Sequence, residues 1–241
     1  MENNETNLKI TGAGESTGGK YNEVTISGAG EINGDMECNM FKVAGSGEVH
    51  GNLQSKIIKA SGAFEVNGNI EGEDIDGKGA VDINGTLKCK NVNMAGAVDI
   101  DGDLYGDIIK ISGALDIKKN CEAEILNLKG CFDIEGLLNA GQINIEMKRR
   151  CNVKEIGGEK IEIRRINESF VSRLFNLSSG RRGKLECEVI EGDDIYLEYT
   201  EAEVVRGNNI VLGPECEIQC VEYRDSFDAA QDSKVAKVKR I

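Results

Sequence analysis

The sequence predicts an all-β protein, a parallel β-helix (solenoid) with three short strands in each coil of about 17 residues. The first observation is a repeat: KGAVDINGTLKC at Lys78 returns one coil later as AGAVDIDGDLYG at Ala95. The second is that apolar residues within a repeat lie two positions apart, so both members of a pair face one side of a strand. The third is composition, since 30 of the 241 residues are glycine and glycine and β-branched residues disfavour helices.

The repeat is defined by two columns of glycine. The first glycine recurs at this constant interval without an insertion, and a β-branched aliphatic residue stands four places after each one. A second glycine stands six places after the first in every copy but one, where Lys119 replaces it. We expect both glycines to form corners with positive φ, which only glycine adopts without steric cost. The first-column glycines are Gly28, Gly45, Gly62, Gly79, Gly96, Gly113 and Gly130.

The chain divides into five segments. After the regular repeat, two similar phrases, IEGDDIYL at Ile190 and VRGNNIVL at Val205, predict further coils with different corners. An irregular basic insertion separates the two sets of coils, and both termini are polar. The expected segments are an N-terminal tail at 1–22, regular coils at 23–166, the insertion at 167–182, further coils at 183–223 and a C-terminal tail at 224–241.

An acidic residue stands three places after each first glycine, where strand alternation directs it to solvent. We favour a role in preventing lateral pairing of sheets, since surface charge opposes it. The alternatives are a ladder of divalent cations or the acid pair of a polysaccharide-cleaving β-helix. The former has few oxygen ligands per level, and the latter lacks stacking aromatic residues. The acid column of the regular repeat is Glu31, Glu48, Glu65, Asp82, Asp99, Asp116 and Asp133.

The composition offers no catalytic, cofactor or metal site. The eight cysteines fall mostly at apolar positions of the repeat, where buried cysteine acts as a small hydrophobe, and we expect them to be reduced. No C-x-x-C pair, Walker loop or nucleophile elbow occurs, and His50 is the single histidine. No apolar run long enough to span a membrane and no apolar signal region are present, which favours a cytoplasmic location.

The acidic chain, with a formal net charge of −13, contains one basic stretch. Residues 148–182 carry 10 Lys and Arg against 4 Asp and Glu. Three interpretations remain open: a structural excursion packed on the solenoid, a contact with an anionic membrane surface, or a dock for acidic protein surfaces. Nucleic acid is not an expected partner, because no stacking platform accompanies the charge. The candidate contact residues are Arg164, Arg165, Phe170, Leu174, Phe175, Arg181 and Arg182.

The phrases ISGAGEINGDM, ASGAFEVNGNI and ISGALDI resemble those of bactofilins, the polymer-forming bacterial cytoskeletal family. The later EGDDIYLE, VVRGNNIVLGPECEI and VEY resemble the second half of longer members of that family. The resemblance covers about residues 20–223. It implies a right-handed, three-faced β-helix that polymerises end to end in the cytoplasm without nucleotide. It also implies a scaffold for proteins of cell shape, the envelope or motility, with itself or a related bactofilin as partner.

We therefore predict a non-enzymatic cytoplasmic scaffold that self-associates through the open ends of its solenoid, where strands leave backbone groups unpaired. The alternative is an adhesin-like or protein-binding solenoid that does not polymerise, and a β-helix polysaccharide enzyme ranks last. The expected polymer interface consists of apolar residues of the end coils, namely Val24, Ile26, Ile32, Ile210, Leu212, Cys216 and Ile218.

Overall fold

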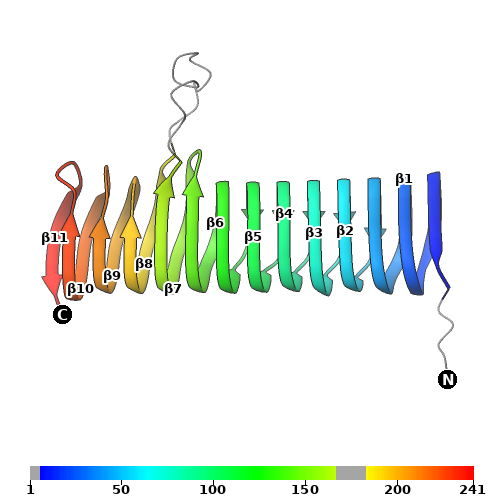
Figure 1. Cartoon of the computed structure of the whole chain (residues 1–241), viewed down its shortest axis with the longest axis horizontal. Coiled ribbons are helices and arrows are strands. Elements are labelled where there is room, and N and C mark those ends of the chain that lie inside the picture. The colour runs from blue at the N-terminus through cyan, green and yellow to red at the C-terminus, as the bar shows by residue number, and fades with distance from the viewer. Residues whose placement is uncertain (1–5, 167–182) are drawn as a thin grey trace, which may run out of the picture. The chain divides into compact units, whose positions relative to one another are not determined.

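The structure is a computed structural model that describes residues 6–166 and 183–241. It confirms the predicted parallel β-helix: every described element is a strand, and successive strands pair in parallel. Contacts divide the chain into two compact units, which we call unit 1 (Met1–Ala123) and unit 2 (Glu124–Ile241). Figure 1 shows the coils of each unit stacked side by side.

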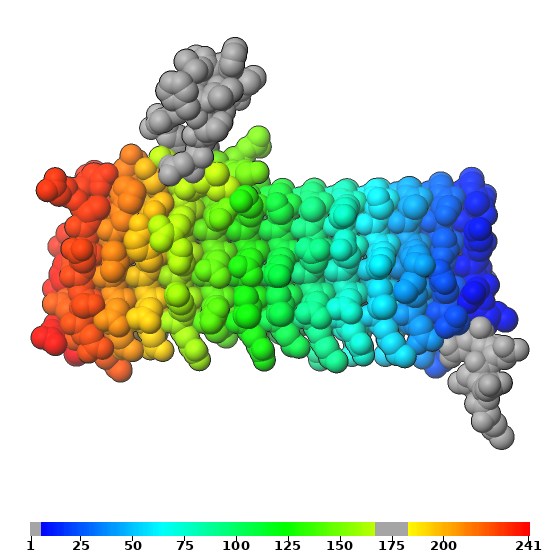
Figure 2. Space-filling model, viewed as in Figure 1, coloured from blue at the N-terminus to red at the C-terminus, as the bar shows by residue number. Residues whose placement is uncertain are grey.

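Each element from β2 to β5 runs through most of one coil as a single strand, whereas the sequence predicts three short strands in each coil. In unit 1, β2 pairs with β1 and β3, and the register advances by 17 positions, as in Leu53 with Ile70. Figure 2 shows each of these coils as a narrow band in contact with the next. The strands of unit 1 are β1 (Leu8–His50), β2 (Leu53–Val66), β3 (Ile70–Ile83), β4 (Leu87–Ile100) and β5 (Leu104–Ile117).

Unit 2 has less regular coils. The register advances by 15 positions from Leu185 to Thr200, and by 17 positions from Glu217 to Lys234. The long element β6 (Cys121–Met147) begins at the end of unit 1 and lies mostly in unit 2. The other strands of unit 2 are β7 (Cys151–Arg165), β8 (Leu185–Leu197), β9 (Thr200–Leu212), β10 (Glu217–Ala229) and β11 (Lys234–Arg240).

The coils extend beyond the bounds expected from the sequence. Strand β1 begins at Leu8, inside the stretch 1–22 that we expected to be a tail. Strands β10 and β11 likewise cover most of 224–241. The sequence does not reveal these additional coils because the glycine and apolar columns are weak there, although Gly12 lies against Gly28 as the first-column glycines lie against one another.

The core of each unit is a set of aliphatic columns. Residues at the paired apolar positions of the repeat are buried, and a column such as Phe64, Val81 and Val98 stacks at the spacing of parallel strands. Phe41 and Phe64 add an aromatic contact in unit 1, with ring centroids 5.5 Å apart. Alternate residues point to solvent, which confirms the predicted period of two.

The two glycine columns serve different purposes. The first-column glycines have positive φ, for example 120° at Gly79, and a Cβ there would lie 2.1 Å from the carbonyl oxygen of Gly62. The second-column glycines at Gly85 and Gly102 do not have positive φ, so our expectation is wrong for them. They are needed because a Cβ would lie 2.5 Å from the backbone oxygen of the preceding coil.

Lys119, the exception in the second column, also has a φ that is not positive, and its side chain is exposed. The corner next to it carries a ladder of polar side chains that we did not predict. In this ladder, a side-chain oxygen accepts a hydrogen bond from the backbone N–H one coil later. Asn69 N donates to Asn52 Oδ1 at 2.9 Å, and Thr86 N donates to Asn69 Oδ1 at 2.9 Å. The ladder residues are Asp35, Asn52, Asn69, Thr86, Asp103 and Asn120.

Candidate functional site

The acid column of unit 1 lies in register on the outside of the solenoid. Glu65 is the strand neighbour of Asp82, and Asp82 is the neighbour of Asp99. The column follows from the repeat, because the residues on either side of each acid are inward apolar positions. This confirms that the carboxylates point away from the core.

Cationic or polar side chains lie close to the carboxylates at the two ends of this column but not to those in its middle. His50 Nε2 lies 2.7 Å from Glu31 Oε1, and its Nδ1 lies 3.4 Å from Glu48 Oε1. Lys118 Nζ lies 2.8 Å from an oxygen of Asp116. Within residues 6–166, no ion pair joins Glu65, Asp82 or Asp99 to a cation.

In the middle of the column, the environment of Asp99 disfavours its charged form. Partial burial, followed by the charges of Asp116 and Asp82, raises the pKa of Asp99 above its ordinary value. The described residues contain no group of three or more metal-ligating side chains placed to hold an ion. The carboxylates of Asp82, Asp99 and Asp116 therefore repel one another along the column.

The seven apolar residues predicted at the solenoid ends are all in the core. Each is at most 2% exposed, because the additional coils cover them. A strand that begins at Leu8 covers the front residues, and β10 and β11 cover the back ones. Placement of the polymer interface on these residues is therefore wrong: Val24, Ile26, Ile32, Ile210, Leu212, Cys216 and Ile218 stabilise the monomer.

The residues that do form the terminal coils differ between the two units. In the first coil of unit 1, Gly14 and Ser16 occupy inward places that hold larger side chains in most later coils. In the last coil of unit 2, Val238 and Ile241 are each 48% exposed. Val238 is the strand neighbour of the buried Val221, so it faces the core but has no described coil over it.

Two of the predicted contact residues are engaged within unit 2. The Arg164 guanidinium lies 4.1 Å from the centre of the Tyr196 ring, and that of Arg165 lies 3.3 Å from the Tyr199 ring. Glu198 connects the two, since Arg164 Nη1 and the Arg165 backbone N–H both donate to its carboxylate at 3.2 Å. These arginines fix the end of β7, where the basic insertion begins.

The other predicted contact residues lie outside the described part of the chain. They belong to the insertion at 167–182, so their role stays a prediction. They are Phe170, Leu174, Phe175, Arg181 and Arg182.

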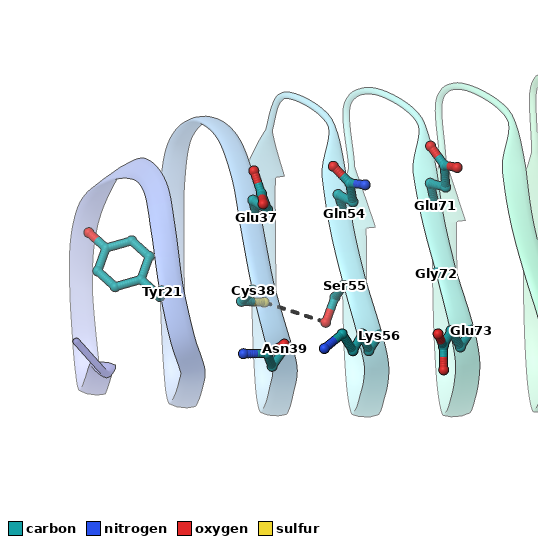
Figure 3. Close-up of a pocket in the computed structure, with 10 residues that line it drawn as sticks. All are labelled: Tyr21, Glu37, Cys38, Asn39, Gln54, Ser55, Lys56, Glu71, Gly72 and Glu73. Carbon is teal, nitrogen blue, oxygen red and sulfur yellow. Dashed lines mark hydrogen bonds between the residues drawn. The ribbon is translucent and has the colours of Figure 1, made fainter. Parts of the chain in front are cut away.

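A shallow groove on unit 1 lies beside a column of small side chains. Figure 3 shows Cys38 and Ser55 at its centre, where Cys38 Sγ donates to Ser55 Oγ at 3.4 Å, with Gly72 on the next coil. Burial raises the pKa of Cys38 above its ordinary value, and that of Cys89 to about 12. These thiols are therefore poor nucleophiles.

Most of the cysteines occupy apolar positions of the repeat, as the sequence predicts. Cys121, Cys151 and Cys216 are buried, and all eight thiols are free. Burial also raises the pKa of Cys121 to about 12. No helix in the described residues is long and apolar enough to cross a membrane.

Comparison with known proteins gives two curated relatives, both from Bacillus subtilis (strain 168). The chain is 42% identical to the uncharacterized protein YhbF over 101 residues, which is 42% of this chain and 40% of YhbF. It is 34% identical to the uncharacterized protein YhbE over 101 residues, which is 42% of this chain and 41% of YhbE. The match thus spans about two fifths of each relative. No family model and no solved structure matches the chain.

Proposed function

We propose that this protein is a non-enzymatic scaffold that self-associates through the edges of its terminal coils without a nucleotide. The observation that carries the proposal is the exposed inward position of the last coil at Val238, which continues the core column of Val221 but is half-exposed. An edge strand of this kind has unpaired backbone N–H and C=O groups that can pair with another strand. The resemblance to bactofilins supports the same function and a cytoplasmic location.

The charge distribution supports association at the edges rather than on the faces. The acid column of unit 1 places like charges about 4.8 Å apart along one face, and two such faces would repel each other. A partner that extends the sheets at a terminal coil would avoid this repulsion. A solenoid that binds other proteins and does not polymerise is the alternative.

Sedimentation velocity of the full chain without nucleotide, over a range of concentrations, tests the proposal. We expect particles larger than the monomer, and we expect Val238→Asp to shift them toward the monomer because it places a charge on the exposed end of the core. Val211→Asp is the matched control, since Val211 is 39% exposed but lies on the outer side of β9, away from the terminal coil. A monomer at every concentration would contradict self-association and favour the alternative.

A further inference from the structure

Outward-facing lysines gather on one part of unit 1. Lys42 and Lys59 are strand neighbours on successive coils. Ser61 follows Lys59 on the same side of the strand and is the strand neighbour of Lys78 on the next coil. Adjacent positions on parallel strands are about 4.8 Å apart, so these side chains form a continuous patch of hydrogen-bond donors. We call this patch the lysine surface, and its members are Lys42, Lys59, Ser61 and Lys78.

The lysine surface borders a shallow hollow of about 480 Å³. The floor of the hollow consists of the buried apolar residues Ile26, Val43 and Ala60. On the same strands, Met40 and Ile57 are half-buried strand neighbours that face outward and add apolar surface beside the lysines. The hollow therefore combines an apolar floor with a cationic rim, a combination that suits contact with another protein.

Lys59 and Lys78 are the cations of this surface that an outside partner can engage. Lys42 Nζ already lies 2.8 Å from Glu23 Oε1. Within residues 6–166 and 183–241, neither Lys59 nor Lys78 has an ion pair, and both side chains are exposed. A carboxylate from outside the chain can therefore form charge-assisted hydrogen bonds with both.

Two aspartates limit the extent of the surface. Asp76 is the strand neighbour of Lys59 and lines the same hollow, and Asn93 Nδ2 donates to its Oδ2 at 3.2 Å. Asp74 accepts a hydrogen bond from Asn91 Nδ2 at 2.8 Å in the same way. A partner's acidic side chains would be repelled there, which confines them to the lysines.

The acid column of unit 1 lies beyond a corner of the coil. Lys59 comes before the corner glycine Gly62, and Glu65 of the acid column comes after it. Charges on a protein surface are screened over about 8 Å at physiological ionic strength. An acidic partner in the hollow would therefore be affected more by the lysines that it contacts than by the acid column.

Other anionic partners fit the lysine surface less well. The described residues that line the hollow include no aromatic side chain on which a base could stack. Duplex DNA carries one negative charge per about 1.7 Å, which a few lysines do not neutralise. A flat anionic membrane would also meet Asp74 and Asp76, which lie on the same strand as Lys78.

We infer that the lysine surface binds an acidic, extended segment of another protein. In an extended segment every second side chain points the same way, so carboxylates at alternate positions can reach Lys59 and Lys78 together. Apolar side chains of the same partner can contact Met40 and Ile57. The inference rests on the proposed scaffold function and states the chemistry of a protein that the scaffold would hold.

Fluorescence anisotropy tests the inference, with a labelled peptide of alternating glutamate and threonine titrated with the full chain. We expect saturable binding that weakens as salt rises, and no binding of the same peptide with glutamine in place of glutamate. Lys59→Gln/Lys78→Gln should weaken binding about five-fold or more, because two exposed ion pairs are lost.

Lys88→Gln/Lys90→Gln is the matched control. Both lysines are exposed, and neither has an ion pair within the described part of the chain. They flank the buried Cys89, away from the hollow, so this variant removes the same charge elsewhere on unit 1. It should bind the peptide as the wild type does.

Two results would overturn the inference directly: no binding of the peptide by the wild type, or equal weakening in the two double variants. Vesicles of phosphatidylcholine with phosphatidylglycerol and a short DNA duplex are titrated in parallel. If either binds the wild type and is lost in Lys59→Gln/Lys78→Gln, whereas the peptide does not bind, the inference is overturned in favour of a membrane or a nucleic acid.

Sedimentation velocity of the wild type and of Lys59→Gln/Lys78→Gln separates this inference from the proposed function. Large wild-type particles without peptide binding would overturn this inference alone. A wild-type monomer that binds the peptide through these lysines would support it and contradict self-association. Particles that dissociate in the double variant would overturn it in favour of a second copy as the occupant of the hollow.

Discussion

The two units build similar coils with different corners. In unit 1 each coil of the regular repeat turns at a glycine with positive φ, from Gly28 to Gly113, and the register advances by 17 positions. In unit 2, past Gly130, the described residues with positive φ are Tyr199 and Glu215, and the advance varies, with 15 positions at one coil and 17 at another. Coils that turn at a glycine with positive φ therefore have a constant length, whereas coils with other corner residues differ in length.

The outer acid column differs between the units in the same way. In unit 1 its middle residues have no cationic partner among residues 6–166. In unit 2, Arg150 pairs with Glu186, Lys184 with Glu201 at 2.6 Å, and Lys234 with Glu217 at 3.3 Å. Among the described residues, the middle of the column thus has no ion pair in unit 1, whereas the column has three ion pairs in unit 2.

The corner glycines should give the largest difference between the units. Gly79→Ala should lower the free energy of unfolding by about 4 kcal/mol, since both strain at positive φ and overlap with the Gly62 oxygen contribute. Gly207→Ala in unit 2 should cost only about 2 kcal/mol, because its φ is not positive and only the overlap remains. Chemical denaturation of both variants checks this, and equal losses would contradict it.

The polar ladder should give the next largest effect. Asn69→Ala removes the acceptor of the Thr86 backbone N–H and should cost about 1–2 kcal/mol. Asn209→Ala in unit 2 removes bonds only to the side chains of Asp194 and Ser226 and should cost less, about 0.5 kcal/mol. Hydrogen exchange at the Thr86 amide should accelerate in the first variant. An unchanged amide would show that the ladder bond contributes nothing there.

Glu215 offers a stabilising change that unit 1 lacks. Its φ of 52° is costly for a residue with a side chain, and its side chain is exposed. Glu215→Gly should raise the free energy of unfolding by about 0.5 kcal/mol. This net gain is the backbone strain that glycine relieves at positive φ, minus the conformational entropy that glycine adds to the unfolded chain. Thermal unfolding measures the gain, and Glu203→Gly, at an exposed position without positive φ, should instead lower stability.

The outer column should give the smallest effects, of opposite sign in the two units. The raised pKa of Asp99 means that its charge destabilises the folded state above that pKa, so Asp99→Asn should stabilise unit 1 slightly at pH 7. The gain should vanish as the pH falls below the ordinary pKa of an aspartate, where the wild-type group is also neutral. Glu201→Gln should destabilise unit 2, because its bond to Lys184 raises the pKa of that lysine.

Denaturation midpoints of both variants at pH 7 and pH 3, in low and high salt, check these signs. Salt should reduce both effects, because the side chains are largely exposed. A loss of stability in Asp99→Asn at pH 7 would contradict uncompensated repulsion in the column.

The sequence predicts the fold well because every coil repeats the same pattern of glycine, apolar and acidic positions. The inward columns, the first-column corners such as Gly62 and the outward acids all follow from spacing alone. The extent of the coils does not, because Gly14 and Ser16 replace apolar residues in the first coil and dilute the pattern. For that reason the sequence places Ile26 at an end, whereas it lies in the core.

The candidate surfaces are harder to predict than the fold. The ladder at Asn52 and Asn69 is visible as polar residues one repeat apart, but spacing does not show that their oxygens accept backbone N–H groups. The stacking of Arg164 on Tyr196 joins residues from different coils of unequal length, so no fixed period relates them. Val238 is exposed because no described strand covers the side of β11 that faces away from β10. The local sequence does not show this.

The side-chain ladder bears on how such a chain changes in evolution. Each rung contacts only the coil before it and the coil after it, and Asn52 and Asn69 occupy nearly identical surroundings. Loss or duplication of one whole repeat at any point within β2–β5 would therefore bring together coils whose surroundings already match. An insertion or deletion of any other length would shift every later ladder residue out of register with the residue one coil before it. Unit 1 is free to gain or lose whole coils without a new contact having to arise.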